Sequence, residues 1–273
     1  MDNQKRLAAG GCGCGMVVAD LHVHTTRSDG TLSFDEVPTA ARRAGVEVVA
    51  VTDHDRLQPA LDGPVSERDG VTLLHGIELR VETETQRLDL LGYGVDPTDE
   101  LRAECERIQR NRRERGAHII ECVEDRLGVS LPVEPRDGLG RPHIARAVAE
   151  VSDHTFQSAF DELIGDDCPC YVAREVPSFE RGCAVLSDAC GLVGLAHPFR
   201  YGDTAAALSK CASLDAVERW YPYGHAVDTG LVDDAIERYD LVPTGGSDAH
   251  GETLGDTGLD AAAWGRVGTA LSV

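Results

Sequence analysis

The sequence predicts an α/β protein whose strands run parallel and close, or nearly close, into a barrel. Short apolar runs rich in Val and Leu recur along the chain and are typical of buried parallel strands. Helical patterns lie between several of them, as expected for strands joined by crossover helices. Most runs also end in residues that can bind a metal. The runs cover residues 17–24, 46–54, 71–78, 87–94, 191–197, 214–220 and 241–250.

The helical patterns carry signals for where a helix starts and stops. In residues 33–45, Ser33 and Glu36 have the spacing of a capping box, and Gly45 is placed to end the helix. A second pattern, residues 228–240, precedes the last apolar run. Helices in these positions fit the crossover connections of a parallel barrel.

The alternation breaks between about residue 98 and residue 179. Three amphipathic helical patterns follow one another there, in residues 99–128, 141–151 and 153–165. We interpret this stretch as a helical insertion beside the barrel mouth. The expected organisation is a flexible leader (1–16), a first part of the barrel (17–98), the insertion (99–180) and a second part of the barrel (181–273).

The formal charge of −21 argues against a basic surface that follows a nucleic-acid backbone, so we expect no binding of duplex nucleic acid. Lys5 and Lys210 are the only lysines, and Arg supplies nearly all the positive charge. This bias, with the excess of Asp and Glu, resembles proteins of halophiles. Salt at molar strength shortens the Debye length to about 3 Å, so an anionic substrate can still reach a local cationic site.

The sequence contains no apolar run long enough to cross a membrane, and the apolar stretch near the N-terminus is too short and too rich in Gly for a secretory signal. We therefore expect a cytoplasmic protein without membrane contact. The nine cysteines are scattered, which favours reduced thiols over a disulfide framework. Cys12 with Cys14, and Cys168 with Cys170, have the weak C-x-C spacing, and we interpret them as ordinary cysteines rather than a soft-metal site.

Candidate metal ligands gather at the ends of the apolar runs. His22 and His24 are two residues apart, so on a strand both imidazoles point to the same side. Asp248 and His250 repeat this spacing, and Asp29 lies in a turn five residues after His24. The other candidates at the ends of runs are His54, Glu78 and His197.

A single His at a strand end is more often an ordinary polar residue than a ligand. Many titratable residues that converge on one face are stronger evidence for a metal site, because burying them without a cation is costly. Mixed imidazole and carboxylate ligands suit Mn, Zn or Fe, whereas Ca or Mg favours oxygen ligands. The set therefore predicts a metal centre.

These residues lie in the motifs DLHVHTTRSDG, VTDHD, GIEL, GRPHIAR, LAHPFRYG and GGSDAHG, between Val17 and about Gly251. In this order the motifs resemble those of the polymerase and histidinol phosphatase (PHP) superfamily. The GRPH motif and the insertion are most similar to the branch that dephosphorylates nucleoside 3',5'-bisphosphates and trims short RNA from its 5' end. The resemblance implies a distorted (β/α)7 barrel with a trinuclear metal site, and we expect two or three divalent metal ions to be bound.

One position departs from the family pattern. In that branch a His lies eleven residues after the bridging Glu, and here Asp89 stands in its place. A carboxylate can still ligate, and the alternative is that one metal position is poorly occupied. The expected ligands are His22, His24, Asp29, His54, Glu78, Asp89, His197, Asp248 and His250.

The resemblance also implies a mechanism, in which a hydroxide shared between cations hydrolyses phosphate monoesters of nucleotides or of short RNA 5' ends. Glu78 bridges two metals, and Glu78 and Asp248 are the expected catalytic residues. Arg141, His143 and Arg200 are candidates for holding a small phosphorylated substrate, because guanidinium matches phosphate oxygens. Alternatively, Arg141 is a surface residue at a helix start, His143 packs at that start, and Arg200 forms an ion pair at the barrel rim.

Three other functions are compatible with parts of this pattern. Amidohydrolases also carry H-x-H on a barrel strand, but many need a lysine at a strand end, and neither Lys5 nor Lys210 lies at one. A histidinol-phosphate-type phosphatase is the nearer rival, and GRPH argues against it. A metal-binding PHP module without activity is favoured by Asp89 and opposed by the eight retained ligand positions.

Overall fold

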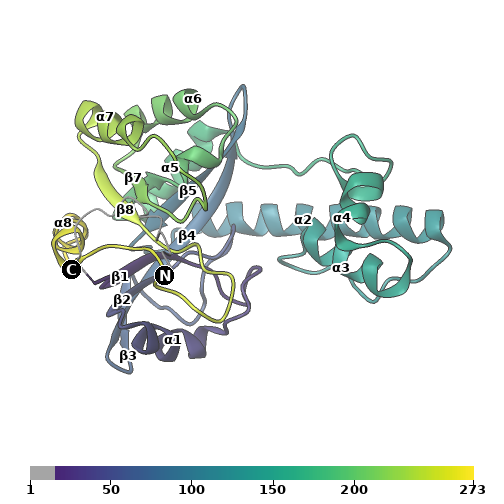
Figure 1. Ribbon diagram of the computed structural model, residues 1–273, viewed down its shortest axis with the longest axis horizontal. Coiled ribbons are helices and arrows are strands. Elements are labelled where there is room, and N and C mark those ends of the chain that lie inside the picture. Colours follow the sequence, from purple (N-terminus) through teal and green to yellow (C-terminus); the bar gives the residue numbers. More distant parts are fainter. Residues whose placement is uncertain (1–15) are drawn as a thin grey trace, which may run out of the picture.

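The computed structural model describes residues 16–273. Most of the expected leader, with Cys12 and Cys14, lies outside the described residues. Seven strands form the predicted distorted barrel (Figure 1), and an eighth, β3 (Val65–Arg68), pairs with β4. The barrel strands, in sheet order, are β1 (Ala19–Val23), β2 (Val48–Val51), β4 (Val71–Glu82), β5 (Arg87–Tyr93), β6 (Leu192–Leu195), β7 (Ala216–Trp220) and β8 (Val242–Gly245).

The segment after β8 meets β1. The His24 N–H donates to the carbonyl of Ala249 at 3.0 Å, and the Ala249 N–H donates to the carbonyl of His22 at 3.3 Å. Close approach depends on Gly246, because a Cβ there would lie 2.4 Å from the backbone nitrogen of His22. This contact places Asp248 and His250 beside the first two histidines.

The expectation of an entirely parallel barrel is wrong at one strand. β5 runs antiparallel to both β4 and β6, while the other neighbouring barrel strands pair in parallel. Residues 83–86 join β4 to β5, and so short a connection allows only a hairpin. As a result, the beginning of β5, which contains Asp89, lies at the edge where the parallel strands end.

Helices cover the outside of the barrel. Ser33 and Glu36 form the predicted capping box, and Gly45 ends the following helix at φ 75°. In Figure 1, α1 lies on the side of β2 and β3, α5 to α7 lie on the opposite side, and α8 lies beside β8. The bounds are η1 (Phe34–Glu36), α1 (Val37–Ala44), α5 (Phe179–Ala189), η3 (Pro198–Arg200), α6 (Thr204–Ser209), η4 (Lys210–Ser213), α7 (Gly230–Tyr239) and α8 (Ala261–Leu271).

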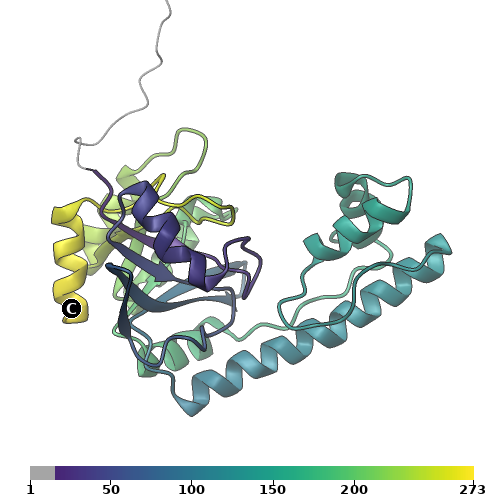
Figure 2. The same ribbon diagram turned by 90° about the horizontal axis from the view of Figure 1, so that it is seen from below.

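A long helix, α2 (Asp99–Leu127), begins against the barrel and extends far beyond it (Figures 1 and 2). Its outer half packs against α3 (Arg141–Val151), α4 (Phe156–Ala159) and a π-helical turn, η2 (Phe160–Ile164), through an apolar cluster separate from the barrel core. The chain then returns to the barrel at α5. Within residues 16–273, none of the helices combines the length and the apolar character that a membrane span requires.

One expectation about the cysteines is corrected within this helical region. Cys122 on α2 and Cys170 form a disulfide, with Cα atoms 5.6 Å apart. The bridge joins residues 48 apart in sequence, because the chain after α4 folds back against α2. Sequence spacing alone could not indicate this pairing. Cys168, two residues from the bridge, remains a free thiol.

Candidate metal centre

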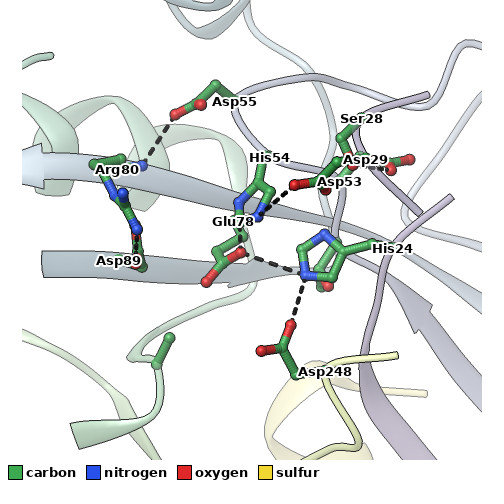
Figure 3. A network of polar contacts seen from close by, with 12 residues as sticks. His24, Ser28, Asp29, Asp53, His54, Asp55, Glu78, Arg80, Asp89 and Asp248 are labelled. Atoms are coloured by element: carbon green, nitrogen blue, oxygen red, sulfur yellow. Dashed lines mark hydrogen bonds and ion pairs between the residues drawn. The ribbon is translucent and has the colours of Figure 1, made fainter. Parts of the chain in front are cut away.

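Nine side chains gather at the edge of the barrel where the parallel strands end. They form three groups, two of which share His24, and the ligand atoms of each group lie within 4.8 Å of one another. These are the nine residues that the sequence predicts as ligands, and Figure 3 shows several of them converging on Glu78. The groups are His24, Asp29, His54 and His250; His22, His24 and Asp248; and Glu78, Asp89 and His197.

The histidines of β1 face the Asp248 segment. Nε2 of His24 lies 3.0 Å from Oδ1 of Asp248, and Nε2 of His22 lies 3.4 Å from the same oxygen. The rings of His24 and His250 stack with their centroids 4.2 Å apart. Both β1 imidazoles are fully buried, so packing restricts the positions open to each ring.

Glu78 lies at the centre of the cluster. Its Oε1 is 3.0 Å from Nε2 of His197, and its Oε2 is 2.7 Å from Nδ1 of His54. Backbone pairing fixes its position, because the Asp55 N–H donates to the Glu78 carbonyl at 2.8 Å. Glu78 thus contacts histidines from separate strand ends, the position expected of a bridging carboxylate.

Asp29 reaches the cluster from the turn after β1, as predicted. Its Oδ1 lies 3.3 Å from Nε2 of His250, and its Oδ2 lies 3.7 Å from Nε2 of His54. Asp53 holds this turn, accepting hydrogen bonds from the Thr25 N–H and hydroxyl and from the Ser28 hydroxyl at 2.7 to 2.8 Å.

The electrostatics of the cluster follow from this crowding. Burial favours neutral groups, but the carboxylate of Glu78 outweighs it and raises the pKa of His54 to about 9. Burial would also raise the pKa of Glu78, yet His54 and His22 hold it well below its usual range. For Asp248, His24 and His22 overcome burial in the same way and lower the pKa. The carboxyls of Glu78 and Asp248 are therefore held in their ionised form, which suits the binding of cations.

The donor atoms also fit a metal. Among residues 16–273, most of the buried side-chain nitrogens and oxygens without a hydrogen-bond partner lie in this cluster. Unpartnered buried polar atoms are costly, so their concentration at one place indicates that another group satisfies them. They are Nε2 of His22, both ring nitrogens of His24, Oδ1 of Asp29, Oε2 of Glu78 and Nδ1 of His197. Some of them lie close to an oppositely charged group, as Oε2 of Glu78 lies close to His54, but without the geometry of a hydrogen bond.

Two further carboxylates support the cluster and were not predicted from the sequence. Glu218 on β7 is fully buried, with Oε1 3.0 Å from Nδ1 of His22 and Oε2 accepting the His197 N–H at 2.7 Å. Asp20, whose pKa burial raises to about 6, accepts hydrogen bonds from Ser247 and Gly255. The only available signal was a charged residue inside an apolar run, which is uncommon in a buried strand.

A cavity of about 270 Å³ opens beside the cluster. His54 and Asp29 line it on the metal side, and Phe160 and Tyr171 line it on the side of the helical insertion. A larger cavity of about 500 Å³ is lined by none of the nine cluster residues. The smaller cavity is rich in cationic side chains, namely Arg80, Arg87, Arg112, Arg115, Arg141 and Arg174.

Asp55 organises this cationic wall. The Arg112 guanidinium donates to its Oδ2 at 2.7 Å, and Arg174 contacts the same oxygen. Asp55 has an αL backbone (φ 52°), uncommon for a residue other than Gly, and its carboxylate is almost fully buried. Two arginines are thus held at the cavity by one carboxylate.

The three predicted substrate-binding residues divide into two groups. Arg141 and His143, at the start of α3, both line the cavity. Arg141 donates to Asp166 at 2.8 Å. Arg200 is not among the residues that line this cavity and instead donates to Oδ2 of Asp248 at 3.1 Å.

Comparisons with known proteins agree with this geometry. Residues 20–154 match the PHP domain family. A 5'-3' exoribonuclease of Haemophilus influenzae is 26% identical over 246 residues, which cover 85% of this chain and 89% of that protein. A phosphoribosyl 1,2-cyclic phosphate 1,2-diphosphodiesterase of Eggerthella lenta is 28% identical, covering 86% and 95%. A 3',5'-nucleoside bisphosphate phosphatase of Chromobacterium violaceum is 28% identical, covering 68% of each chain.

Solved structures share the same architecture. A Bifidobacterium adolescentis protein described as a metal-dependent phosphoesterase superposes with a TM-score of 0.76 at 25% identity, covering 92% of this chain and 96% of that one. A Chromobacterium violaceum protein described as an amidohydrolase superposes with a TM-score of 0.72 at 22% identity, covering 93% of this chain and 96% of that one. This likeness shows the fold alone. Residues 20–154 of the chain therefore match the PHP domain, and the chain is a metal-dependent phosphoesterase.

Proposed function

We propose that the protein removes phosphate from small substrates that carry more than one phosphate group, such as nucleoside 3',5'-bisphosphates or the 5' ends of short RNA. The observation that carries this proposal is the cavity beside the cluster, which six arginines line in a chain of net charge −21. An unreactive phosphate bound there would hold the ester bond of a second phosphate at the cluster.

The proposed cofactors are two or three ions of Mn, Zn or Fe, held by imidazoles and carboxylates of the cluster. When bound, such ions neutralise the charge of the phosphoryl oxygens and lower the pKa of water, so that a nucleophile is available at neutral pH. The mixed imidazole and carboxylate donors favour these metals over Mg or Ca.

Residues of the chain bind and orient the rest of the substrate. Arg112 and Arg174, held by Asp55, present fixed cationic groups at one wall of the cavity. Arg141 lies over the ring of Tyr171, with its guanidinium carbon 5.4 Å from the ring centroid. The aromatic rings of Phe160 and Tyr171 offer flat apolar surfaces for a nucleobase.

The relatives support a nucleotide substrate. The Chromobacterium violaceum relative is a 3',5'-nucleoside bisphosphate phosphatase, and the Haemophilus influenzae relative is a 5'-3' exoribonuclease. The Eggerthella lenta relative acts instead on a phosphoribosyl cyclic phosphate, which makes a cyclic phosphodiester a necessary comparison substrate. Histidinol phosphate, the substrate of the rival PHP branch, is a second comparison substrate.

Phosphate release with Mn²⁺ from adenosine 3',5'-bisphosphate, AMP, a 5'-phosphorylated trinucleotide, a phosphoribosyl cyclic phosphate and histidinol phosphate tests the proposal. We expect kcat/KM for the bisphosphate to exceed that for AMP by about tenfold or more, because one charge-assisted contact supplies that much. Arg174→Gln should remove most of this preference. Arg219→Gln, which breaks a surface ion pair with Asp233, is the control. Equal values for bisphosphate and AMP would contradict the proposal.

A further inference from the structure

Arg80 and Asp89 lie directly opposite each other on the antiparallel strands β4 and β5. Glu78 is two residues before Arg80 on β4, so the two side chains share one face of the sheet. Asp89 faces Arg80 across the strand pair on that same face. Strand register therefore places a guanidinium beside the carboxylates of one candidate metal group (Figure 3).

The contact between Arg80 and Asp89 uses both carboxylate oxygens. Nε of Arg80 donates to Oδ1 of Asp89 at 2.7 Å, and Nη2 donates to Oδ2 at 2.6 Å. The Asp89 side chain is only 3% exposed, so water does not compete strongly for it. This is the bidentate geometry in which Arg binds carboxylate most strongly.

The other donors of this metal group are also engaged. Oε1 of Glu78 and Nε2 of His197 lie 3.0 Å apart, in hydrogen-bond contact. Oδ2 of Asp89 is 3.7 Å from the same nitrogen of His197. A cation bound by Asp89, Glu78 and His197 would compete with the guanidinium for the Asp89 oxygens and would be repelled by it, because both carry positive charge.

From these contacts we infer that the Arg80–Asp89 pair replaces one of the three cations, so that the chain binds two divalent ions. The Arg80 guanidinium supplies the third positive charge. It lines the cavity beside the cluster and is 40% exposed, so its N–H groups that do not contact Asp89 are available to donate to a phosphate bound there. Arg80 is thereby a substrate-contacting residue as well as the partner of Asp89.

The inference rests on the proposed metal centre. The number of metal ions bound per chain tests the inference, and the presence of any bound metal tests the metal centre. Chelator-treated protein is brought to equilibrium by dialysis against excess Mn²⁺, and the Mn bound per chain is measured by elemental analysis. We expect two equivalents for the parent protein and two for Asp89→Asn, because Asp89 is not a ligand. Arg80→Gln combined with Asp89→His removes the guanidinium and adds a nitrogen donor, and it should bind three.

Arg87→Gln is the matched control, since Arg87 lines the same cavity but pairs with Glu82 on the rim, and it should leave the count at two. Circular dichroism confirms the fold of each variant. Three equivalents in the parent, loss of one equivalent in Asp89→Asn, or only two in the folded double variant would each overturn the inference. Absence of bound Mn from the parent would instead contradict the metal centre itself.

Discussion

Oε1 of Glu218 lies 3.0 Å from Nδ1 of His22, so the imidazole presents its Nε2 to the cluster. The same carboxylate accepts the backbone N–H of His197, a residue in an uncommon backbone conformation with φ 27°. Glu218 thus orients one proposed ligand and restrains the backbone of a second.

Glu218→Gln should weaken metal binding about 10- to 100-fold, because groups that orient a ligand contribute affinity without touching the ion. Isothermal titration with Mn²⁺ measures the change, and thermal unfolding in chelator verifies the fold. Glu237→Gln, a change on the outer helix α7, should bind Mn²⁺ like the parent. Unchanged affinity in Glu218→Gln would show that packing alone orients His22.

His22→Ala and Asp248→Ala should each reduce phosphate release by at least about 100-fold while leaving the fold intact. Each removes a proposed ligand at the open end of the barrel, and the Asp248 change also removes the partner of Arg200. Initial rates with saturating Mn²⁺ measure the loss, and circular dichroism separates chemistry from folding. Activity near that of the parent would exclude the affected residue as a ligand.

Much of the fold and of the candidate site could be predicted because both depend on local pattern. The spacing of His22 and His24 fixes which way both imidazoles point once the run is a strand. Parallel strands then bring the ends of distant runs to one edge, which is why Glu78 and Asp248 meet.

The parts that sequence could not predict depend on register and on the packing of distant segments. The contact of Arg80 with Asp89 exists because β5 turns back as a hairpin partner of β4. Glu218 was indistinguishable from any charged residue near a strand end. The arginines of α2 lie in a long helical pattern that does not mark them as binding residues, and only the return of the chain past Tyr171 and Arg174 encloses Arg112 and Arg115 in a cavity.

His75 should make folding stability depend on pH. The imidazole is buried, and its Nε2 accepts the Gln58 N–H at 3.2 Å. Burial and, to a lesser degree, Arg102 lower its pKa to about 4 from 6.5. As the pH falls, the imidazole is protonated in the unfolded chain before it is protonated in the folded protein, and this favours unfolding. The stability of the fold is therefore greatest above pH 6.5 and decreases as the pH falls towards 4.

Urea unfolding in chelator at pH 7.5 and pH 4.5 measures this effect. From pH 7.5 to pH 4.5 the free energy of unfolding should fall by about 2 to 3 kcal/mol more in the parent than in His75→Gln. The amide oxygen of the variant can accept the same hydrogen bond without titrating. The comparison with the variant removes contributions from all other groups. Equal losses in both proteins would mean that His75 titrates normally in the folded state.

The Cys122–Cys170 disulfide should stabilise the helical insertion. The bridge spans 48 residues, and closing a loop of that length lowers the entropy of the unfolded chain by an amount worth about 4 kcal/mol. Cys122→Ser should therefore increase the rate at which a protease cleaves residues 128–170. Cys168→Ser is the control, because this neighbouring thiol lies outside the bridge. Equal cleavage rates would indicate that α2 and its partner helices hold together without the bridge.

The cluster around Glu78 should hydrolyse phosphate esters only when divalent ions are bound. The most direct test measures metal content and phosphate release from adenosine 3',5'-bisphosphate in the same samples, first after chelation and then during stepwise return of Mn²⁺. We expect activity to be absent from metal-free protein and to rise in proportion to the filling of the sites. Full activity in protein shown to be free of metal, or none after the sites are filled with Mn²⁺, Zn²⁺ or Fe²⁺, would contradict it.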